Sequence, residues 1–268
     1  MKYDRRDFLA QIGAGVLALT LGTDSLTSYA MGNRKKIPNI IIVMADDLGW
    51  SELGCYGNIF NETPNLDKLA EQGIRFTDAY APAPVCSPTR AAFLTGQYPA
   101  RIGILDYLRP DTENALSKSY ITIAEKLKEA GYATSMVGKW HLSGYIPNGA
   151  KTEVRAKDQG FDEELITEIK NVGNGANFYP YVFRDQKTTW LNVSEKRLPG
   201  NEYLTDRMNL EAVDFIERHK KGPFFLYLSH FAPHTILNGK EELAGKYRKK
   251  HASGQSKVSD CYLCKDSV

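Results

Sequence analysis

The stretch Pro84–Gly96 reads PVCSPTRAAFLTG, and the rest of the chain is best understood from it outwards. Proline is favoured in the first turn of a helix, where its missing N–H has no partner, so Pro88 predicts a helix beginning close to Cys86. A side chain at such a position lies beside free backbone N–H groups and the positive end of the helix dipole. Arg90, one turn further on, can direct its guanidinium to the same place. The stretch therefore predicts an anion-binding position at Cys86.

A lone cysteine near a helix start is more often structural than reactive. Here the spacing Cys-x-Pro-x-Arg, followed by two small residues, two large apolar ones, Thr and Gly, resembles the sulfatase signature over all of residues 84–96. In that family the cysteine is oxidised to formylglycine, whose hydrate is the nucleophile. The resemblance implies that Cys86 is catalytic, contributes to the metal site and is the substrate of a formylglycine-generating enzyme. It also implies that Arg90 is catalytic.

The composition is that of a globular protein with a sizeable core, because 42% of the 268 residues are hydrophobic and 25% are charged. The net charge of +2 gives no reason to expect a nucleic-acid partner. Four cysteines are too few and too scattered for a disulfide framework. Cys261 and Cys264 form a lone C-x-x-C without the second ligand pair that zinc would need.

Residues 1–30 are typical of a targeting segment. Arg5 and Arg6 are paired, residues 12–21 are moderately apolar, and residues 28–30 offer the small side chains at which signal peptidases cleave. The pattern resembles a twin-arginine signal peptide, which implies the twin-arginine translocase as a partner and a periplasmic or secreted protein. A short amphipathic N-terminal helix is the alternative. The apolar run is too short for a stable membrane span.

Two adjacent carboxylates follow the first apolar run. Residues 40–44 read IIIVM, which predicts a strand buried on both faces, and Asp46 and Asp47 come directly after it. Ligands of open α/β sheets bind beyond the carboxyl ends of strands, and neighbouring carboxylates repel each other unless a cation lies between them. A turn or helix-capping pair is the alternative. In sulfatases the first strand ends in such a pair, so the resemblance implies that both residues bind Ca²⁺ or Mg²⁺.

A lysine and a histidine follow a second predicted strand, residues 132–137. Lys139 and His141 are two residues apart, so an extended chain directs both to the same side, where they can bind an anion and transfer a proton. A surface lysine beside a packed histidine is the alternative. The stretch GYATSMVGKWH resembles the second sulfatase signature, which implies that Lys139 binds the sulfate and that His141 supports the formylglycine diol. The sequence PHT after a further strand, 224–229, likewise implies that His234 contacts the sulfate.

Strands alternating with helices predict an α/β fold with a mostly parallel central sheet flanked by helices. Further helices are expected at 64–72, 121–130 and 203–220, and a short strand at 74–77. The resemblance covers roughly residues 36–250 and implies an alkaline phosphatase-like fold. Residues 150–200 are polar and rich in predicted loops, and selection of the substrate is expected there.

The chain departs from the family towards its end. Sulfatases carry a later Asp-Asn pair for the metal and a small C-terminal domain, whereas no Asp-Asn dipeptide occurs here. We therefore expect residues 36–250 to be the N-terminal part of a sulfatase catalytic domain, followed by an aberrant tail, 251–268. A chain with so incomplete a metal shell is expected to be a poor enzyme.

The functional prediction is a sulfuric ester hydrolase of the arylsulfatase type that acts on sulfated glycans or aryl sulfates. Two alternatives stay open. A phosphate or phosphonate ester hydrolase of the same superfamily would need a similar clamp for a tetrahedral anion. A non-catalytic glycan-binding or inactive gene product would fit the missing metal ligands.

Overall fold

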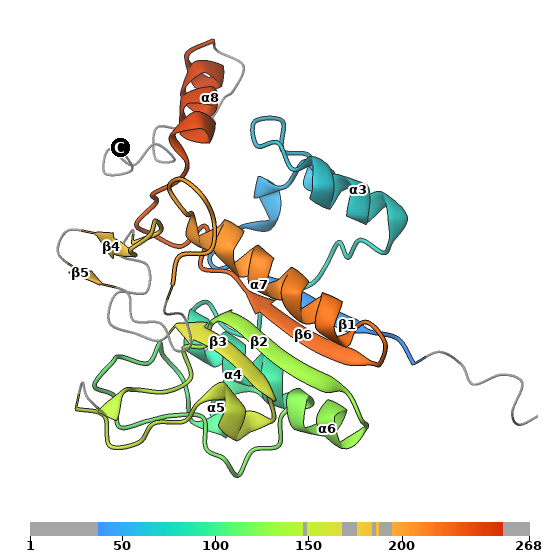
Figure 1. The fold of residues 1–268 in the computed structure, drawn as a ribbon, viewed down its shortest axis with the longest axis vertical. Coiled ribbons are helices and arrows are strands. Elements are labelled where there is room, and N and C mark those ends of the chain that lie inside the picture. Colours follow the sequence, from blue (N-terminus) through green and yellow to red (C-terminus); the bar gives the residue numbers. More distant parts are fainter. Residues whose placement is uncertain (1–36, 147–148, 168–175, 184–185, 188–194, 254–268) are drawn as a thin grey trace, which may run out of the picture. The chain divides into compact units, whose positions relative to one another are not determined.

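A four-stranded parallel sheet forms the centre of the fold in a computed structural model, which describes residues 37–146, 149–167, 176–183, 186–187 and 195–253 (Figure 1). All elements named below belong to the unit of residues 39–268. The strands lie in the order β1 (Ile40–Met44), β6 (Phe224–Ser229), β2 (Ala133–Lys139) and β3 (Glu163–Thr167). Met44 and Gly138 both align with Ser229, so these three strands end at one edge of the sheet.

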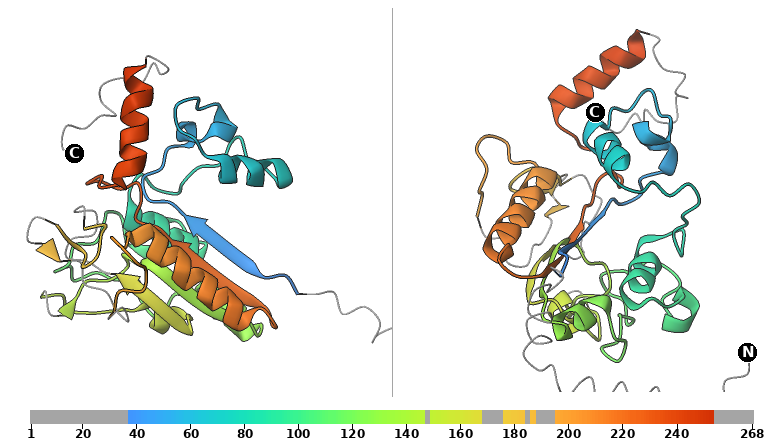
Figure 2. Two further views of the ribbon diagram at one scale, coloured as in Figure 1. Left: turned by 45° about the horizontal axis from the view of Figure 1, so that its top comes forward. Right: turned by 90° about the vertical axis from the view of Figure 1, so that its right-hand side faces the viewer.

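Helices cover both faces of this sheet, as the views of Figure 2 show. One face carries α7 (Leu204–His219), which packs on β2 and β6. The opposite face carries α4 (Cys86–Thr95) and α6 (Ile123–Glu129), with the short α5 (Pro99–Ile102) against α4. This arrangement confirms the predicted α/β fold with a parallel sheet flanked by helices.

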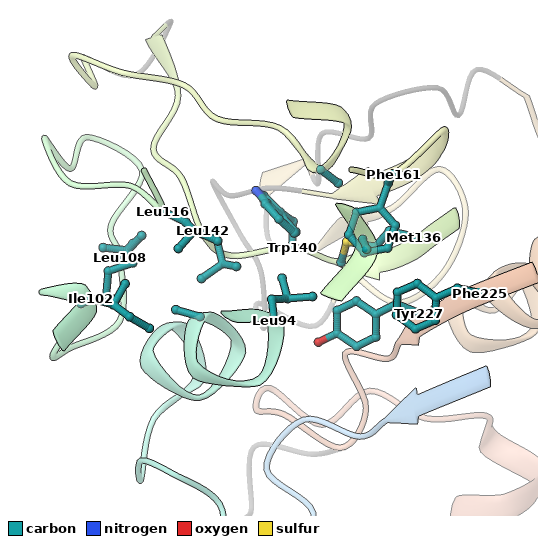
Figure 3. Close-up of a cluster of buried hydrophobic side chains, with 14 of the residues drawn as sticks. Leu94, Ile102, Leu108, Leu116, Met136, Trp140, Leu142, Phe161, Phe225 and Tyr227 are labelled. Atoms are coloured by element: carbon teal, nitrogen blue, oxygen red, sulfur yellow. The ribbon is translucent and has the colours of Figure 1, made fainter. Parts of the chain in front are cut away.

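The central strand β6 supplies side chains to both layers of the core. Its six residues are all buried, and they alternate between the two faces as strand geometry requires. Phe225 and Tyr227 face the α4 side, where they meet Leu94 and Phe161 (Figure 3). The α7 side receives Phe224, Leu226 and Leu228, which pack with Met208 and Phe215.

The remaining described elements connect or extend these layers. The loop after β1 forms two 3-10 turns, Trp50–Glu52 and Gly54–Tyr56, and leads into α3 (Pro64–Gln72). Another 3-10 turn, Ala156–Gln159, precedes β3, and β4 (Val182–Phe183) pairs antiparallel with β5 (Gln186–Lys187). After β6, α8 (Glu241–Ala252) contacts the loop before α3 through the Tyr247 hydroxyl, which accepts from the Glu62 N–H at 3.0 Å.

Two strand predictions are wrong. Ile41 and Val43 are 46% and 61% exposed, because β1 is the edge strand and α7 covers only β2 and β6. The strand is therefore buried on one face rather than two. Residues 74–77 form no strand, and the side chains of Ile74 and Phe76 are exposed rather than packed into the core.

The other predicted helices and strands among the described residues are present, and their observed ends differ from the predicted ones by no more than two residues. Thr122 caps α6: its hydroxyl accepts a hydrogen bond from the Glu125 N–H, and the Glu125 carboxylate accepts one from the Thr122 N–H. The β2 strand continues two residues beyond its expected end, so that Lys139 belongs to the strand itself. Gly138 has a φ of 109°, and a Cβ there would lie 2.0 Å from the Ser229 carbonyl oxygen. Glycine at this position therefore allows β2 and β6 to approach closely beside Lys139.

No helix among the described residues has both the length and the apolar composition needed to cross a bilayer.

Candidate active site

Parallel strand ends bring the predicted functional residues to one edge of the sheet. Asp46 and Asp47 follow β1, Lys139 ends β2, and His234 follows β6. A cavity of about 530 Å³ at this edge is lined by Asp47, Cys86, Lys139, His141 and His234. A neighbouring one of about 490 Å³ is lined by Asp46, Asp47, Cys86 and Arg90. The structure thus gathers all seven predicted site residues around two adjoining cavities, and Cys86 and Asp47 border both.

Cys86 is the first residue of α4, so the helix begins at the cysteine and Pro88 is its third residue. Its side chain is partly exposed, and the thiol is not in a disulfide. The first turn of α4 is held by two hydrogen bonds: the Ser87 hydroxyl accepts from the Leu108 N–H at 2.9 Å, and the Thr89 hydroxyl donates to the Ala83 carbonyl at 2.9 Å. Cys86 is therefore presented from a fixed turn to both cavities.

Asp46 is held between two buried cations. Its carboxylate forms an ion pair with the ammonium of Lys139, and its other oxygen lies 3.4 Å from the guanidinium of Arg90. All three side chains are at most 4% exposed. Burial alone raises the pKa of Asp46, but the charges of Lys139 and Arg90 outweigh this effect and hold the pKa below its usual value. Asp46 is therefore a buried carboxylate whose charge is compensated within the chain.

Arg90 links this ion-pair cluster to the ends of two strands. Its Nη1 donates to the Lys139 carbonyl at 2.9 Å and to the Tyr227 hydroxyl at 3.3 Å, and it also contacts the hydroxyl of Ser229. The hydrogen bonds and the ion pair of the guanidinium go to Lys139, Tyr227, Ser229 and Asp46, so the expected direction towards Cys86 stays a prediction. Arg90 borders the same cavity as Cys86 while it fixes Asp46 and the end of β2.

His141 is a buried, neutral histidine. Its Nε2 lies 2.8 Å from the Leu108 carbonyl oxygen, and since a carbonyl only accepts, Nε2 carries the proton. Burial, together with the nearby charge of Lys139, lowers the pKa of His141 to about 3. The ring is therefore neutral, with its one proton on Nε2.

Acidification is expected to destabilise the protein through His141. The unfolded chain binds a proton at this histidine near pH 6.5, whereas the folded chain resists it down to about pH 3. The contribution of His141 to the free energy of unfolding is therefore complete above pH 6.5 and is lost as the pH falls towards 3. Between pH 7 and pH 5 the free energy of unfolding falls by about 2 kcal/mol through this group. Urea unfolding at both pH values should show a smaller loss for His141→Gln, whose amide can still reach the Leu108 carbonyl. Equal losses in both proteins would contradict the buried neutral state.

His234 and Asp47 lie at the open side of the cavity. The Nε2 atom of His234 is 3.7 Å from the Asp47 carboxylate, and its Nδ1 lies 2.5 Å from the Thr235 carbonyl oxygen. The Asp47 side chain is 58% exposed, in contrast to that of Asp46. Asp47 has a φ of 64°, which turns the chain sharply after β1. The two adjacent aspartates therefore have different surroundings, although sequence reasoning gave them one role.

Asp46, Asp47 and Cys86 are the side chains expected to hold a divalent cation, and they line one cavity. Among the residues that the structure describes, no three His, Cys, Asp or Glu side chains gather as a metal site. Asp46 is already paired with Lys139 and Arg90, and Ca²⁺ takes about six to eight oxygen ligands. The described residues alone do not complete such a site.

Sequence reasoning missed four residues around the cavity. Tyr227 and Ser229 fix Arg90 from within a strand whose apolar run gave no functional signal. Tyr107 and Arg109 line the cavity from a loop for which no motif was recognised. The only available signal was the presence of an arginine and a tyrosine in a loop shortly after the Cys86 helix.

The comparisons with known proteins identify the family. Residues 38–264 match the family model named Sulfatase, and the chain therefore belongs to the sulfatase family. Human N-acetylgalactosamine-6-sulfatase is 34% identical over 239 residues, which cover 83% of this chain and 45% of that protein. Human steryl-sulfatase is 30% identical over 276 residues, with coverage of 78% and 47%.

A solved structure supports the same assignment. The protein Ps i-CgsB, crystallised in complex with k-i-k-neocarrahexaose, superposes with a TM-score of 0.64 at 32% identity, covering 79% of this chain and 49% of that one. The chain thus spans about half the length of the relatives that it matches.

Proposed function

We propose that the protein hydrolyses sulfate esters and that residue 86 is its reactive centre. The observation that carries this proposal is that Cys86, Lys139, His141 and His234 line the same cavity. Lysine and histidine are residue types that bind an anion and transfer a proton. Membership of the sulfatase family supports the reaction class.

The mechanism requires Cys86 in the form of formylglycine. One hydroxyl of the hydrated aldehyde forms a bond to sulfur while the bond between sulfur and the substrate's alcohol oxygen breaks, and the alcohol leaves with a proton. Loss of the proton from the second hydroxyl then re-forms the aldehyde and expels the sulfate, a step for which a thiol has no group. The chain's own residues supply the setting. The turn at the start of α4 fixes residue 86 beside the free N–H groups of the helix, which favour an anion. Neutral His141 lines the same cavity as residue 86 and supports the diol, and its hydrogen bond to the Leu108 carbonyl fixes its ring.

Lys139 and His234 bind the sulfate oxygens in this proposal, and they differ in their exposure to solvent. Lys139 is fully buried and is held by Asp46, whereas the His234 side chain is 25% exposed. Arg90 acts chiefly by positioning, because its hydrogen bonds go to the end of β2 and to β6. Such fixed charges stabilise negative charge that develops on oxygen during the transfer.

A divalent cation, Ca²⁺ or Mg²⁺, belongs to the proposal through Asp46 and Asp47, the two carboxylates at the end of β1.

The substrate class proposed is a sulfated glycan, with aryl sulfates as surrogates. The support comes from relatives: one is an N-acetylgalactosamine-6-sulfatase by name, and another was crystallised with a neocarrahexaose.

Paired assays on an aryl sulfate and the corresponding aryl phosphate test the reaction class. The chain, co-produced with a formylglycine-generating enzyme, is expected to release sulfate at least about tenfold faster than phosphate, a difference of about 1.4 kcal/mol in barrier height. A preference for the phosphate would instead indicate a phosphate ester hydrolase of the same superfamily.

Export through the twin-arginine translocase is a further part of the proposal; residues 1–36, on which it rests, lie outside the described residues. Replacing Arg5 and Arg6 together with lysine is expected to leave most of the precursor in the cytoplasm, because the paired arginines are the recognised feature of such signals. Cell fractionation and immunoblotting measure the distribution. Export unchanged from that of the parent chain would contradict the proposal.

A further inference from the structure

Beyond the reacting sulfate, the cavity of Cys86 has a second cationic wall that no step above uses. Tyr107, Leu108, Arg109 and Pro110 line it from the loop that follows α5. Tyr107 and Arg109 are exposed, and Leu108 between them is buried. Because side chains alternate along an extended segment, the two exposed residues can face the cavity while Leu108 packs into the core.

The backbone of this loop is fixed at three points. The Leu108 N–H donates to the Ser87 hydroxyl at 2.9 Å, and its carbonyl accepts from His141 Nε2 at 2.8 Å. The Pro110 carbonyl accepts from the Tyr145 N–H at 2.9 Å. The loop is thus attached both to the helix that presents Cys86 and to the histidine of the cavity, so its side chains keep a set position relative to the reactive centre.

Arg109 and Tyr107 form a preorganised pair on this wall. The guanidinium donates to the Tyr107 hydroxyl at 3.2 Å, and its carbon lies 4.9 Å from the centre of the Tyr107 ring. No carboxylate among the described residues forms an ion pair with Arg109, whereas Lys139 in the same cavity is paired with Asp46. Arg109 therefore offers an uncompensated positive charge.

Resting on the sulfatase function proposed above, we propose that Arg109 and Tyr107 form a subsite for a second anionic group of the substrate. Lys139 is fully buried, whereas Arg109 is exposed, so the cavity has a deep end for the reacting sulfate and an open end for the rest of the substrate. A guanidinium pairs in bidentate fashion with carboxylates and with sulfate-like oxyanions. The substrate class is thus a polyanionic glycan that carries a sugar carboxylate or a second sulfate ester.

Equilibrium binding tests this subsite independently of turnover. The chain is produced without the formylglycine-generating enzyme, so that residue 86 stays a cysteine, and isothermal titration calorimetry compares three disaccharides of one backbone. The first carries one sulfate, the second carries one sulfate and one carboxylate, and the third carries two sulfates. At least one doubly anionic probe is expected to bind about three- to tenfold more tightly than the first at low salt, and raised ionic strength is expected to reduce the difference. Whichever of the two doubly anionic probes binds more tightly shows whether the subsite prefers a carboxylate or a second sulfate.

Three variants locate the effect. Arg109→Gln is expected to remove the gain from the second anion and to leave the singly sulfated probe unchanged, and Tyr107→Phe to remove part of it by loss of the hydroxyl. Arg101→Gln is the matched control, because Arg101 is an exposed arginine of α5 that does not line the cavity.

Four results would overturn the subsite: no binding of any probe, no gain from the second anion, a gain that survives Arg109→Gln, or an equal loss for all three probes in that variant. Sulfate release from an aryl sulfate, which has no second anion, tests the sulfatase function separately, so failure of either idea is recognisable.

Discussion

Replacement of Cys86 by alanine is expected to reduce sulfate release from an aryl sulfate to the rate measured without protein. Alanine lacks the thiol group of Cys86, so its side chain cannot be oxidised to the aldehyde. The helix and its hydrogen bonds through Ser87 and Thr89 stay in place. Ion chromatography of free sulfate measures the effect, with the parent chain co-produced with a formylglycine-generating enzyme.

Cys55→Ala is the matched control for this experiment. Cys55 is the other cysteine among the described residues, and it lies in the 3-10 turn Gly54–Tyr56, where its N–H donates to Asp67 at 2.7 Å. It lines neither cavity that contains Cys86, so its replacement should leave the rate within about twofold of the parent. Residual release by Cys86→Ala, or a comparable loss in Cys55→Ala, would place the reactive centre elsewhere.

Replacement of Asp46 by asparagine is expected to lower the free energy of unfolding by about 3–5 kcal/mol, because it leaves the buried charges of Lys139 and Arg90 without their counterion. The amide has nearly the shape of the carboxylate, so lost packing contributes little. Urea denaturation followed by circular dichroism measures the change.

Asp47→Asn serves as the matched control, one residue further along the chain. Its side chain is 58% exposed and the Nε2 atom of His234 is 3.7 Å away, so the expected change is within about 0.5 kcal/mol. Equal effects of the two substitutions would show that the buried ion-pair cluster around Asp46 is not stabilising the fold.

The sequence was sufficient to predict those parts of the fold that local patterns specify. Short apolar runs predicted β1 and β6, the stretch 132–137 predicted β2, and the apolar face of residues 121–130 together with Gly131 predicted α6. The candidate site was predictable because parallel strands bring their carboxyl ends together, which placed Asp46, Lys139 and His234 at one edge.

What the sequence could not supply was long-range pairing. The exposed face of β1 depends on its place at the edge of the sheet, which the run IIIVM does not encode. The difference between Asp46 and Asp47 depends on Lys139 and Arg90, which lie about 40 to 90 residues away in the chain. The wall formed by Tyr107 and Arg109 depends likewise on two hydrogen bonds of Leu108, whose N–H donates to Ser87 and whose carbonyl accepts from His141.

The central claim, that residue 86 attacks the sulfate ester, is tested most directly by a covalent adduct. A serine at this position has one hydroxyl, which can attack sulfur but leaves no second hydroxyl to expel the sulfate. Cys86→Ser, incubated with an aryl sulfate and analysed by peptide mass spectrometry, is therefore expected to accumulate one sulfate ester on the peptide of residues 84–96, at residue 86. An unmodified peptide after prolonged incubation, or a sulfate ester on another residue, would contradict the claim.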